Sequence, residues 1–310
     1  MKLITKLSIA FAIIAGLGVA TVCYHRWARK QPPILPFTVK VVEIVPHAEL
    51  LATKLQNYVP PVQHHLVVVI PSYNNAKYYM SNLDSVYGQD YENYSVVYID
   101  DASPDKTGEL VSAYVKKHGQ QHRTKLVVNP VNQGACANLY HAITGLSPEA
   151  IVVILDGDDW LAKPDVLSLV NKIYNKYDVL MTHGSYQYFP YKGRKALYCE
   201  SFPDHVITNN QFRGHEWVTG HLRTFKASLF HRIKKEDLMH DGSFFPVVYD
   251  VAMLLPMLEM AGNRSLFVPD VLYLYNYITP FSDNRLHEKK CAFFNTLIRK
   301  KAAYAPVAFE

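Results

Sequence analysis

The sequence predicts an α/β fold in which a mostly parallel sheet is flanked by helices. Short apolar runs rich in valine and isoleucine recur through the first half of the chain, as strands buried on both faces require. Segments of helix length separate these runs, and this alternation argues for a doubly wound sheet. With 310 residues, of which 49% are hydrophobic and 19% charged, the chain has enough material for one large or two small globular domains.

Four strands are expected in the first half, at residues 66–70, 95–99, 125–128 and 151–155. A serine cap followed by proline predicts a helix start at Ser103-Pro104-Asp105, and the proline of Lys163-Pro164-Asp165 predicts another. From about residue 178, aromatic and histidine residues are mixed with polar ones too closely for a regular element to be assigned. We expect the aromatic residues there to belong to the core or its rim, namely Tyr186, Tyr188, Phe189, Tyr191 and Trp217.

Two segments of different character precede the first strand. Residues 7–24 contain no charge and are long enough to span a bilayer, so we expect residues 1–30 to form a single N-terminal membrane anchor. A basic start and small residues near position 20 leave open a cleaved signal segment, which would give a secreted or periplasmic protein. Basic residues flank both ends of the apolar run, so the orientation stays undecided. The proline-rich residues 31–64 predict a linker or stalk.

Charge and cysteine content exclude some classes of function. The formal net charge of +5 is mild and lies partly beside the N-terminal apolar run, so we do not expect nucleic-acid binding. The four cysteines are far apart and form no CxxC pair, which argues against a structural zinc site or a disulfide framework.

A cluster of mostly polar residues directly follows each expected strand. The clusters are Pro71-Ser72-Tyr73-Asn74, Asp100-Asp101, residues 129–134 and Asp156-Gly157-Asp158-Asp159. Ligands of open parallel sheets bind outside the carboxyl ends of the strands, where all four clusters would lie. Adjacent carboxylates repel each other unless a cation compensates them, and Mg²⁺ or Mn²⁺ prefers such oxygen ligands. We therefore expect a divalent metal, with Gly157 letting the backbone pass close to a ligand. A turn capped by Asp159 is the alternative.

Four segments in this order carry a family resemblance: "VVVIPSYNNAKYY", "SVYGQDYENYSVVYIDDASPDKT", "NPVNQGACANLYHAI" and "IVVILDGDDWLAKPDVL". Together they resemble the nucleotide-sugar-binding half of family 2 glycosyltransferases of the GT-A fold. The resemblance implies a Rossmann-like GT-A domain over residues 65–285, with a donor half (65–177) and an acceptor half (178–285). Residues 286–310 would then form a C-terminal tail, and the N-terminal apolar helix would precede the domain.

The resemblance also implies roles on the donor side. The residues that would line the donor are Pro71, Ser72, Tyr73, Asp101, Gly134, Asn138, Asp156 and Asp158. Among them Tyr73 would lie near the base, and Asp101 would bind the uracil ring, which implies a UDP donor. Asp158 would lie near the ribose or the sugar, and Asp158 and Asp159 would form the metal site, with Asp159 as the main ligand of Mn²⁺ or Mg²⁺ on the diphosphate.

On the acceptor side the resemblance implies Asp250 as the base that deprotonates the attacking hydroxyl, in preference to Asp241 or Glu236. Relatives often have glutamate before this acid, whereas this chain has Tyr249. An N-cap role for Asp250 in a helix over residues 251–261 would be compatible with that of a base. His221 would face the acceptor.

Relatives often complete the metal site with a histidine after the last strand. Here the equivalent stretch is residues 277–279, so either His287 takes this role or no residue does.

The implied activity is an inverting, metal-dependent transfer of a sugar from a nucleoside diphosphate to an acceptor hydroxyl. The acceptor could be a saccharide, a lipid-linked molecule or a protein. A nucleotidyltransferase is less favoured, because "PSYNNAKYY" lacks the glycine-rich basic loop that holds a triphosphate. A non-catalytic nucleotide-sugar-binding protein of the same fold is the other alternative. No run of apolar helices follows the domain, so a processive synthase is not expected.

Overall fold

The computed structural model describes residues 50–190, 196, 198–280 and 287–308. They all belong to one compact unit, Ala48–Glu310. The expected membrane segment 7–24, most of the expected stalk and Tyr191 lie outside the described residues. Among the described helices, none is both long and apolar enough to cross a membrane.

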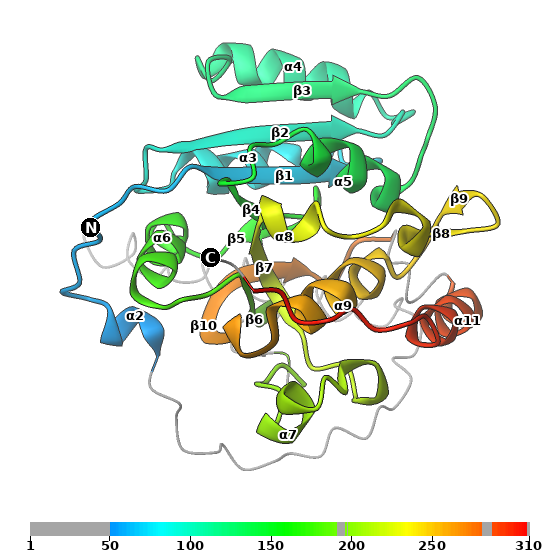
Figure 1. Ribbon diagram of the computed structural model, residues 1–310. Coiled ribbons are helices and arrows are strands. Elements are labelled where there is room, and N and C mark those ends of the chain that lie inside the picture. The colour runs from blue at the N-terminus through cyan, green and yellow to red at the C-terminus, as the bar shows by residue number, and fades with distance from the viewer. Residues whose placement is uncertain (1–49, 191–195, 197, 281–286, 309–310) are drawn as a thin grey trace, which may run out of the picture. The chain divides into compact units, whose positions relative to one another are not determined.

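A mixed eight-stranded sheet forms the centre of the unit, in the order β3-β2-β1-β4-β7-β6-β10-β5. Neighbouring strands are parallel from β3 to β4 and between β6 and β10, whereas β7 runs antiparallel to β4 and β6, and β5 runs antiparallel to β10. Figure 1 shows β3, β2 and β1 side by side along one edge. The strands are β1 (Leu66–Ser72), β2 (Tyr94–Asp100), β3 (Thr124–Val128), β4 (Ile151–Ile154), β5 (Trp160–Leu161), β6 (Met181–Phe189), β7 (Gly220–Lys226) and β10 (Ser265–Asn276). The predicted α/β class with flanking helices is confirmed.

Helices cover both faces of the sheet because alternate residues of the strands point to opposite sides. In β1, Val67 and Val69 belong to one buried cluster, and Leu66, Val68 and Ile70 belong to the other. The second cluster also includes residues of α3 (Tyr79–Tyr87), α4 (Thr107–Lys117) and α6 (Val166–Lys176). The first includes residues of α5 (Ala135–Thr144), α8 (Ala227–Phe230) and α9 (Tyr249–Ala261).

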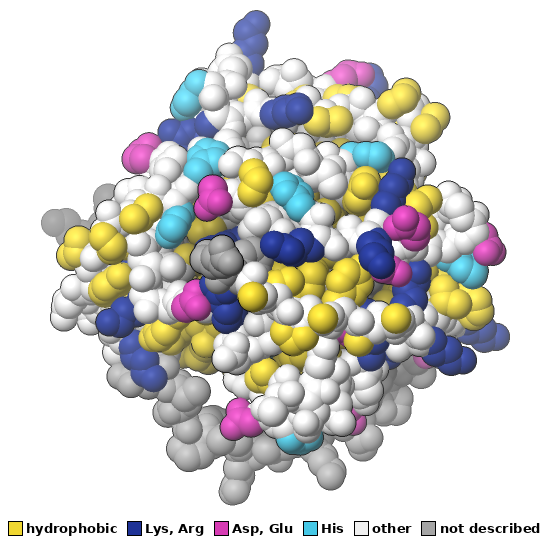
Figure 2. All heavy atoms as spheres, viewed as in Figure 1, with side chains coloured by type: hydrophobic (Ala, Val, Ile, Leu, Met, Phe, Trp, Pro, Cys, Tyr) yellow, Lys and Arg dark blue, Asp and Glu magenta, His cyan; other side chains and the backbone are white. Residues whose placement is uncertain are grey.

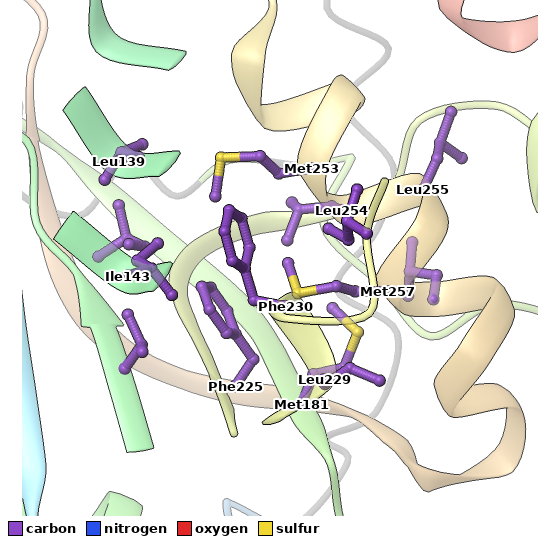
Figure 3. Close-up of a cluster of buried hydrophobic side chains, with 14 of the residues drawn as sticks. Leu139, Ile143, Met181, Phe225, Leu229, Phe230, Met253, Leu254, Leu255 and Met257 are labelled. Carbon is purple, nitrogen blue, oxygen red and sulfur yellow. The ribbon is translucent and has the colours of Figure 1, made fainter. Parts of the chain in front are cut away.

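Figure 3 shows the first cluster, in which aromatic, leucine and methionine side chains from the sheet and three helices meet. Phe225 of β7 and Phe230 of α8 stack with their ring centroids 6.0 Å apart. Leu139 of α5 and Met257 of α9 are fully buried in the same cluster. Burial of each such side chain stabilises the fold by roughly 1.5–3 kcal/mol, so α9 is held firmly against the sheet.

The aromatic region after residue 178 contains two central strands, β6 and β7. Their pattern is hidden because β6 buries polar residues, including Thr182, His183 and Ser185, on a sheet that is covered on both sides. Tyr186 is 4% exposed and Phe189 is 38% exposed, which matches the expected core and rim.

Two predicted helix starts have different outcomes. The helix α4 begins at Thr107 and not at Pro104. The hydroxyl of Ser103 instead accepts a hydrogen bond from the Asn74 N–H at 2.9 Å. The second prediction is close, because α6 begins at Val166, one residue after Asp165.

Both ends of the described chain pack onto the domain. In α2 (Leu51–Lys54), the N–H groups of Leu51 and Ala52 donate to the carboxylate of Asp270 at 2.8 and 3.2 Å. The last part of the expected stalk is therefore part of the compact unit.

The expected C-terminal tail is also structured. It contains the helix α11 (Glu288–Arg299), which packs against α9, and further on the Tyr304 N–H donates to Glu259 at 2.9 Å. Short elements complete the unit: α7 (Asp204–Thr208), η1 (Phe212–Gly214), η2 (Lys235–Leu238), β8 (Met239–His240), β9 (Ser243–Phe244) and η3 (Gly262–Arg264). Figure 2 shows basic, acidic and hydrophobic side chains interspersed over one face, without a continuous basic stripe on that face.

Candidate functional site

The acidic loop that follows β4 is fixed by the elements on either side of it. The side-chain amide of Asn82, in α3, donates to the carbonyl of Asp156 at 3.0 Å and to that of Asp159 at 2.8 Å. The Gly157 N–H donates to the Pro71 carbonyl of β1 at 3.1 Å. A Cβ atom added to Gly157 would lie 2.6 Å from the Ser72 Oγ and 2.7 Å from the Ser72 Cβ. Glycine is required here because β1 passes so close to the loop.

Asp159 lies beneath this loop and is 1% exposed. Its Oδ2 accepts the hydroxyl of Tyr273 at 2.5 Å, and its Oδ1 accepts the Asn276 N–H at 2.6 Å. Burial raises the pKa of the Asp159 carboxyl well above the ordinary value, and the charges of Asp158 and Asp156 add to this effect. Both oxygens therefore bind the loop to β10.

Asp156 and Asp158 lie nearer the surface, and both are half-buried. The hydroxyl of Tyr249 donates to the Asp156 Oδ1 at 2.7 Å, and that of Tyr273 lies 3.5 Å from its Oδ2. Burial raises the pKa of Asp156, although the Tyr249 hydrogen bond and the Arg223 charge oppose this shift. The two acids thus form a concentration of negative charge at the carboxyl end of β4.

Asp250, in the first turn of α9, is paired with an arginine from the neighbouring strand. The Arg223 guanidinium donates to the Asp250 Oδ2 at 2.9 Å, and the side chains are 8% and 24% exposed. Arg223 lies opposite Ile154 in the pairing of β7 with β4. Burial lowers the pKa of Arg223, but the negative charges of Asp250 and Asp156 raise it above the ordinary value. Arg223 is therefore a permanent cation between the two acidic groups.

The expected nucleoside side is built around Asp101, which is 3% exposed. Its Oδ1 accepts the Asn129 amide at 2.8 Å and the Gln133 N–H at 2.9 Å, and its Oδ2 accepts the Gly134 N–H at 2.8 Å. Asn129 also donates to the Oδ1 of Asn138 at 2.7 Å. Asp101 therefore orders the segment before α5.

Two expected donor residues differ strongly in exposure. Ser72 is 4% exposed, and its hydroxyl is bonded to the hydroxyl of Tyr98 at 2.8 Å. Tyr73 is 41% exposed, so its ring is available to a ligand. Ser72 therefore belongs to the support of the site, whereas Tyr73 belongs to its surface.

The two expected histidines are not placed alike. His221 is 7% exposed and stacks on Tyr273 with ring centroids 4.3 Å apart. Burial, with the charge of Arg223, lowers its pKa well below the ordinary value, so it is a neutral ring beneath the site. His287 is exposed at the start of α11. Among the described residues, no group of three or more His, Cys, Asp or Glu side chains is arranged to hold a metal.

The sequence reasoning missed the supporting residues Asn82, Arg223 and Tyr273. Asn82 could have been found in the sequence, because it is a polar residue among the buried apolar positions of α3, next to Leu83. Arg223 and Tyr273 could not have been found in this way, since only the pairing of distant strands brings them to the acids.

Comparison with known proteins identifies the family of this chain. The family model described as "Glycosyl transferase family 2" matches residues 67–234, just over half of the chain. The glycosyltransferase GlyG of Streptococcus pneumoniae is 23% identical over 220 residues, which cover 67% of this chain and 69% of that protein. The poly(ribitol-phosphate) beta-glucosyltransferase of Bacillus spizizenii is 28% identical over 166 residues, which cover 52% of this chain and 25% of that protein.

Solved structures show the same fold. The mannosyltransferase PcManGT of Pyrobaculum calidifontis, solved with GDP-Man and Mn²⁺, has a TM-score of 0.54 at 22% identity and covers 96% of this chain and 77% of its own. Residues 1–349 of TarS from S. aureus, solved with UDP-GlcNAc, have a TM-score of 0.53 at 19% identity, and the match covers 69% of this chain and 59% of that one. The chain therefore belongs to glycosyl transferase family 2 and is a glycosyltransferase.

Proposed function

We propose that this glycosyltransferase is inverting and metal-dependent, and that it moves a sugar from UDP to an acceptor hydroxyl. The observation that carries the proposal is the joining of two acids from distant segments. Tyr249 donates to Asp156 at 2.7 Å, and Arg223 donates to Asp250, two residues beyond Val248, at 2.9 Å. Tyr249 and Asp250 are the first two residues of α9, so an acid for the donor side and an acid for the acceptor side are both bonded at the start of this helix, as a transfer between two substrates requires.

The choice of uridine is supported by the unused acceptor capacity of Asp101. A carboxylate oxygen accepts about two hydrogen bonds. The Oδ1 of Asp101 accepts two, whereas its Oδ2 accepts one, from the Gly134 N–H. The remaining position of Oδ2 matches the single N–H donor of uracil, and the exposed ring of Tyr73 would stack on the base.

For the metal we propose Asp158 and not Asp159. Asp159 is 1% exposed and is bonded to β10 beneath the loop, whereas Asp158 is half-buried at the tip of the loop, nearer the surface. Burial, with the charges of neighbouring acids, raises the pKa of Asp156 and Asp159, so a bound cation would stabilise the ionised carboxylates, and these oxygen ligands fit Mn²⁺ or Mg²⁺. Asp158 would hold the ion together with oxygens of the donor diphosphate. When bound, the ion would neutralise charge on the leaving diphosphate.

The proposed base is Asp250. Its Oδ2 accepts from Arg223 and its Oδ1 accepts from the Val251 N–H at 2.9 Å, which leaves further acceptor positions on both oxygens. In the transfer, the acceptor O–H proton passes to Asp250 while the acceptor oxygen bonds to the anomeric carbon. The bond from that carbon to the diphosphate breaks, and UDP leaves with the electron pair. A single displacement of this kind inverts the anomeric configuration.

A donor panel tests this function. The full chain is incubated with UDP-sugars and GDP-sugars, simple saccharide acceptors, and either Mn²⁺ or EDTA, and the released nucleoside diphosphate is measured. We expect release from a UDP-sugar that requires metal and increases with acceptor. Asp250→Asn should lower the turnover by about a hundredfold to ten-thousandfold, the range for a lost general base.

Asp241→Asn is the matched control, because the Asp241 side chain is 88% exposed in the β8–β9 turn. It should leave the turnover unchanged. Near wild-type turnover of Asp250→Asn would refute the base assignment, and turnover of GDP-sugars alone would refute the uridine assignment.

A further inference from the structure

We propose that Tyr249 is a positioning residue that couples the acidic donor loop to the helix that carries the base. This inference rests on the proposed function, in which Asp156 supports the donor and Asp250 accepts the proton. Nothing in the chemistry of the transfer requires a tyrosine at this position. Its role follows from the contacts that its side chain and its neighbours make.

Among the described residues, Tyr249 has the side chain that donates the short hydrogen bond to the Asp156 carboxylate. Its hydroxyl lies 2.7 Å from the Asp156 Oδ1. Tyr273 lies near the same acid, but a hydroxyl donates only one hydrogen bond. The Tyr273 proton belongs to Asp159, whose Oδ2 is 2.5 Å away, compared with 3.5 Å for Asp156. The orientation of the Asp156 carboxylate therefore depends on Tyr249.

The other end of the coupling is the first turn of α9. Tyr249 is the first residue of this helix and Asp250 is the second. The turn is bound to the donor loop by Tyr249 and to β7 by the Arg223 bond to Asp250. The strands β7 and β4 are paired, with Arg223 opposite Ile154. Both contacts therefore hold the turn against the same part of the sheet.

The backbone just before Tyr249 is strained. Val248 has a φ of +50°, a left-handed conformation that is unfavourable for a β-branched residue. Such a conformation persists only where the surrounding structure determines it. It sets the direction in which the chain enters α9, and so the directions of Tyr249 and Asp250. Without the Tyr249 hydroxyl, the strained turn would lose its contact with the donor loop.

The test compares Tyr249→Phe with Tyr174→Phe, which also removes a buried tyrosine hydroxyl. Tyr174 lies on α6, its hydroxyl is bonded to Thr224 at 3.0 Å, and its ring belongs to the second buried cluster, whereas α9 packs in the first. Three quantities are measured: the thermal midpoint, the dissociation constant of UDP with Mn²⁺ by calorimetry without acceptor, and kcat with the donor KM. A purely structural hydroxyl would affect the first quantity alone.

We expect Tyr249→Phe to weaken UDP binding severalfold and to lower kcat by about tenfold to a hundredfold, since misplacement of a reacting group by about 1 Å has costs of this size. Tyr174→Phe should keep the wild-type values of UDP binding and kcat. If Tyr249→Phe kept UDP binding and kcat within about twofold of the wild type, the coupling role would be refuted. A wild-type protein that turns over no UDP-sugar would instead refute the proposed function.

Discussion

The close passage of the acidic loop over β1 can be tested by adding a single methyl group, in the variant Gly157→Ala. The new Cβ would lie 2.6 Å from the Ser72 Oγ, 2.7 Å from the Ser72 Cβ and 2.6 Å from the Asn75 Nδ2. Ser72 has little room to move, because its hydroxyl is bonded to Tyr98 at 2.8 Å and to Asn75 at 3.0 Å. The loop must therefore move away from β1, and Asp156 and Asp158 move with it.

The expected magnitude follows from overpacking of a buried site, which costs about 1–3 kcal/mol of unfolding free energy. A loss of about 2 kcal/mol would lower the thermal midpoint of a domain of this size by roughly 4–8 °C. Activity is expected to fall further than stability, because misplacement of reacting groups by about 1 Å lowers rates by about a hundredfold.

The assay combines thermal unfolding with nucleotide release. Gly214→Ala is the matched control, since a Cβ at Gly214 meets no atom within 4 Å. The variant Ser72→Gly removes two of the three obstructing atoms and leaves the Asn75 Nδ2, so Gly157→Ala should be less harmful in that background, and the double-mutant cycle measures the difference. A cost of Gly157→Ala that is below about 0.5 kcal/mol, or that is unchanged in the Ser72→Gly background, would refute the reasoning.

Three further predictions concern buried carboxylates. Glu259→Gln should lower the free energy of unfolding in denaturant by about 3–5 kcal/mol, because Glu259 is fully buried and pairs with Arg213 at 2.5 and 2.9 Å. A loss of unfolding free energy below about 1 kcal/mol would contradict this. Asp101→Ala should weaken UDP binding and destabilise the protein by about 1.5–3 kcal/mol for each charge-assisted bond that is lost, and unchanged UDP affinity would count against the role of Asp101. The raised pKa of Asp159 means that the folded state binds its proton more tightly than the unfolded state. In metal-free buffer, stability should therefore fall as the pH rises from about 3.8 through the raised folded pKa, and Asp159→Asn should flatten this dependence in unfolding measured across that range.

The first four strands were predictable because a strand buried on both faces needs apolar residues throughout. The runs at 66–70 and 151–155 correspond to β1 and β4, which pair in parallel. The carboxyl ends of these strands then had to meet, and the contact between Gly157 and Ser72 shows that they do. In β6, by contrast, Thr182 and His183 are buried polar residues, and their pattern does not distinguish a central strand from a loop.

Within the site, the sequence identified the acids but not their orientations. Asp158 and Asp159 are adjacent, but their surroundings differ because Tyr273 and Asn276 of β10, more than a hundred residues later, donate hydrogen bonds to Asp159. The start of α4 was missed for a similar reason. Serine often caps helices, but the Ser103 hydroxyl accepts a hydrogen bond from the Asn74 N–H. This contact joins two loops, and the local sequence does not encode it.

The central claim is that Asp158, at the tip of the acidic loop, holds the metal on the donor while Asp159 holds the loop. It is tested most directly by calorimetry of UDP binding, with and without Mn²⁺, for the wild type, Asp158→Asn and Asp159→Asn. The account predicts that Asp158→Asn loses the increase in affinity that Mn²⁺ gives, and that Asp159→Asn keeps it. Loss of that increase in Asp159→Asn, with retention in Asp158→Asn, would contradict the account.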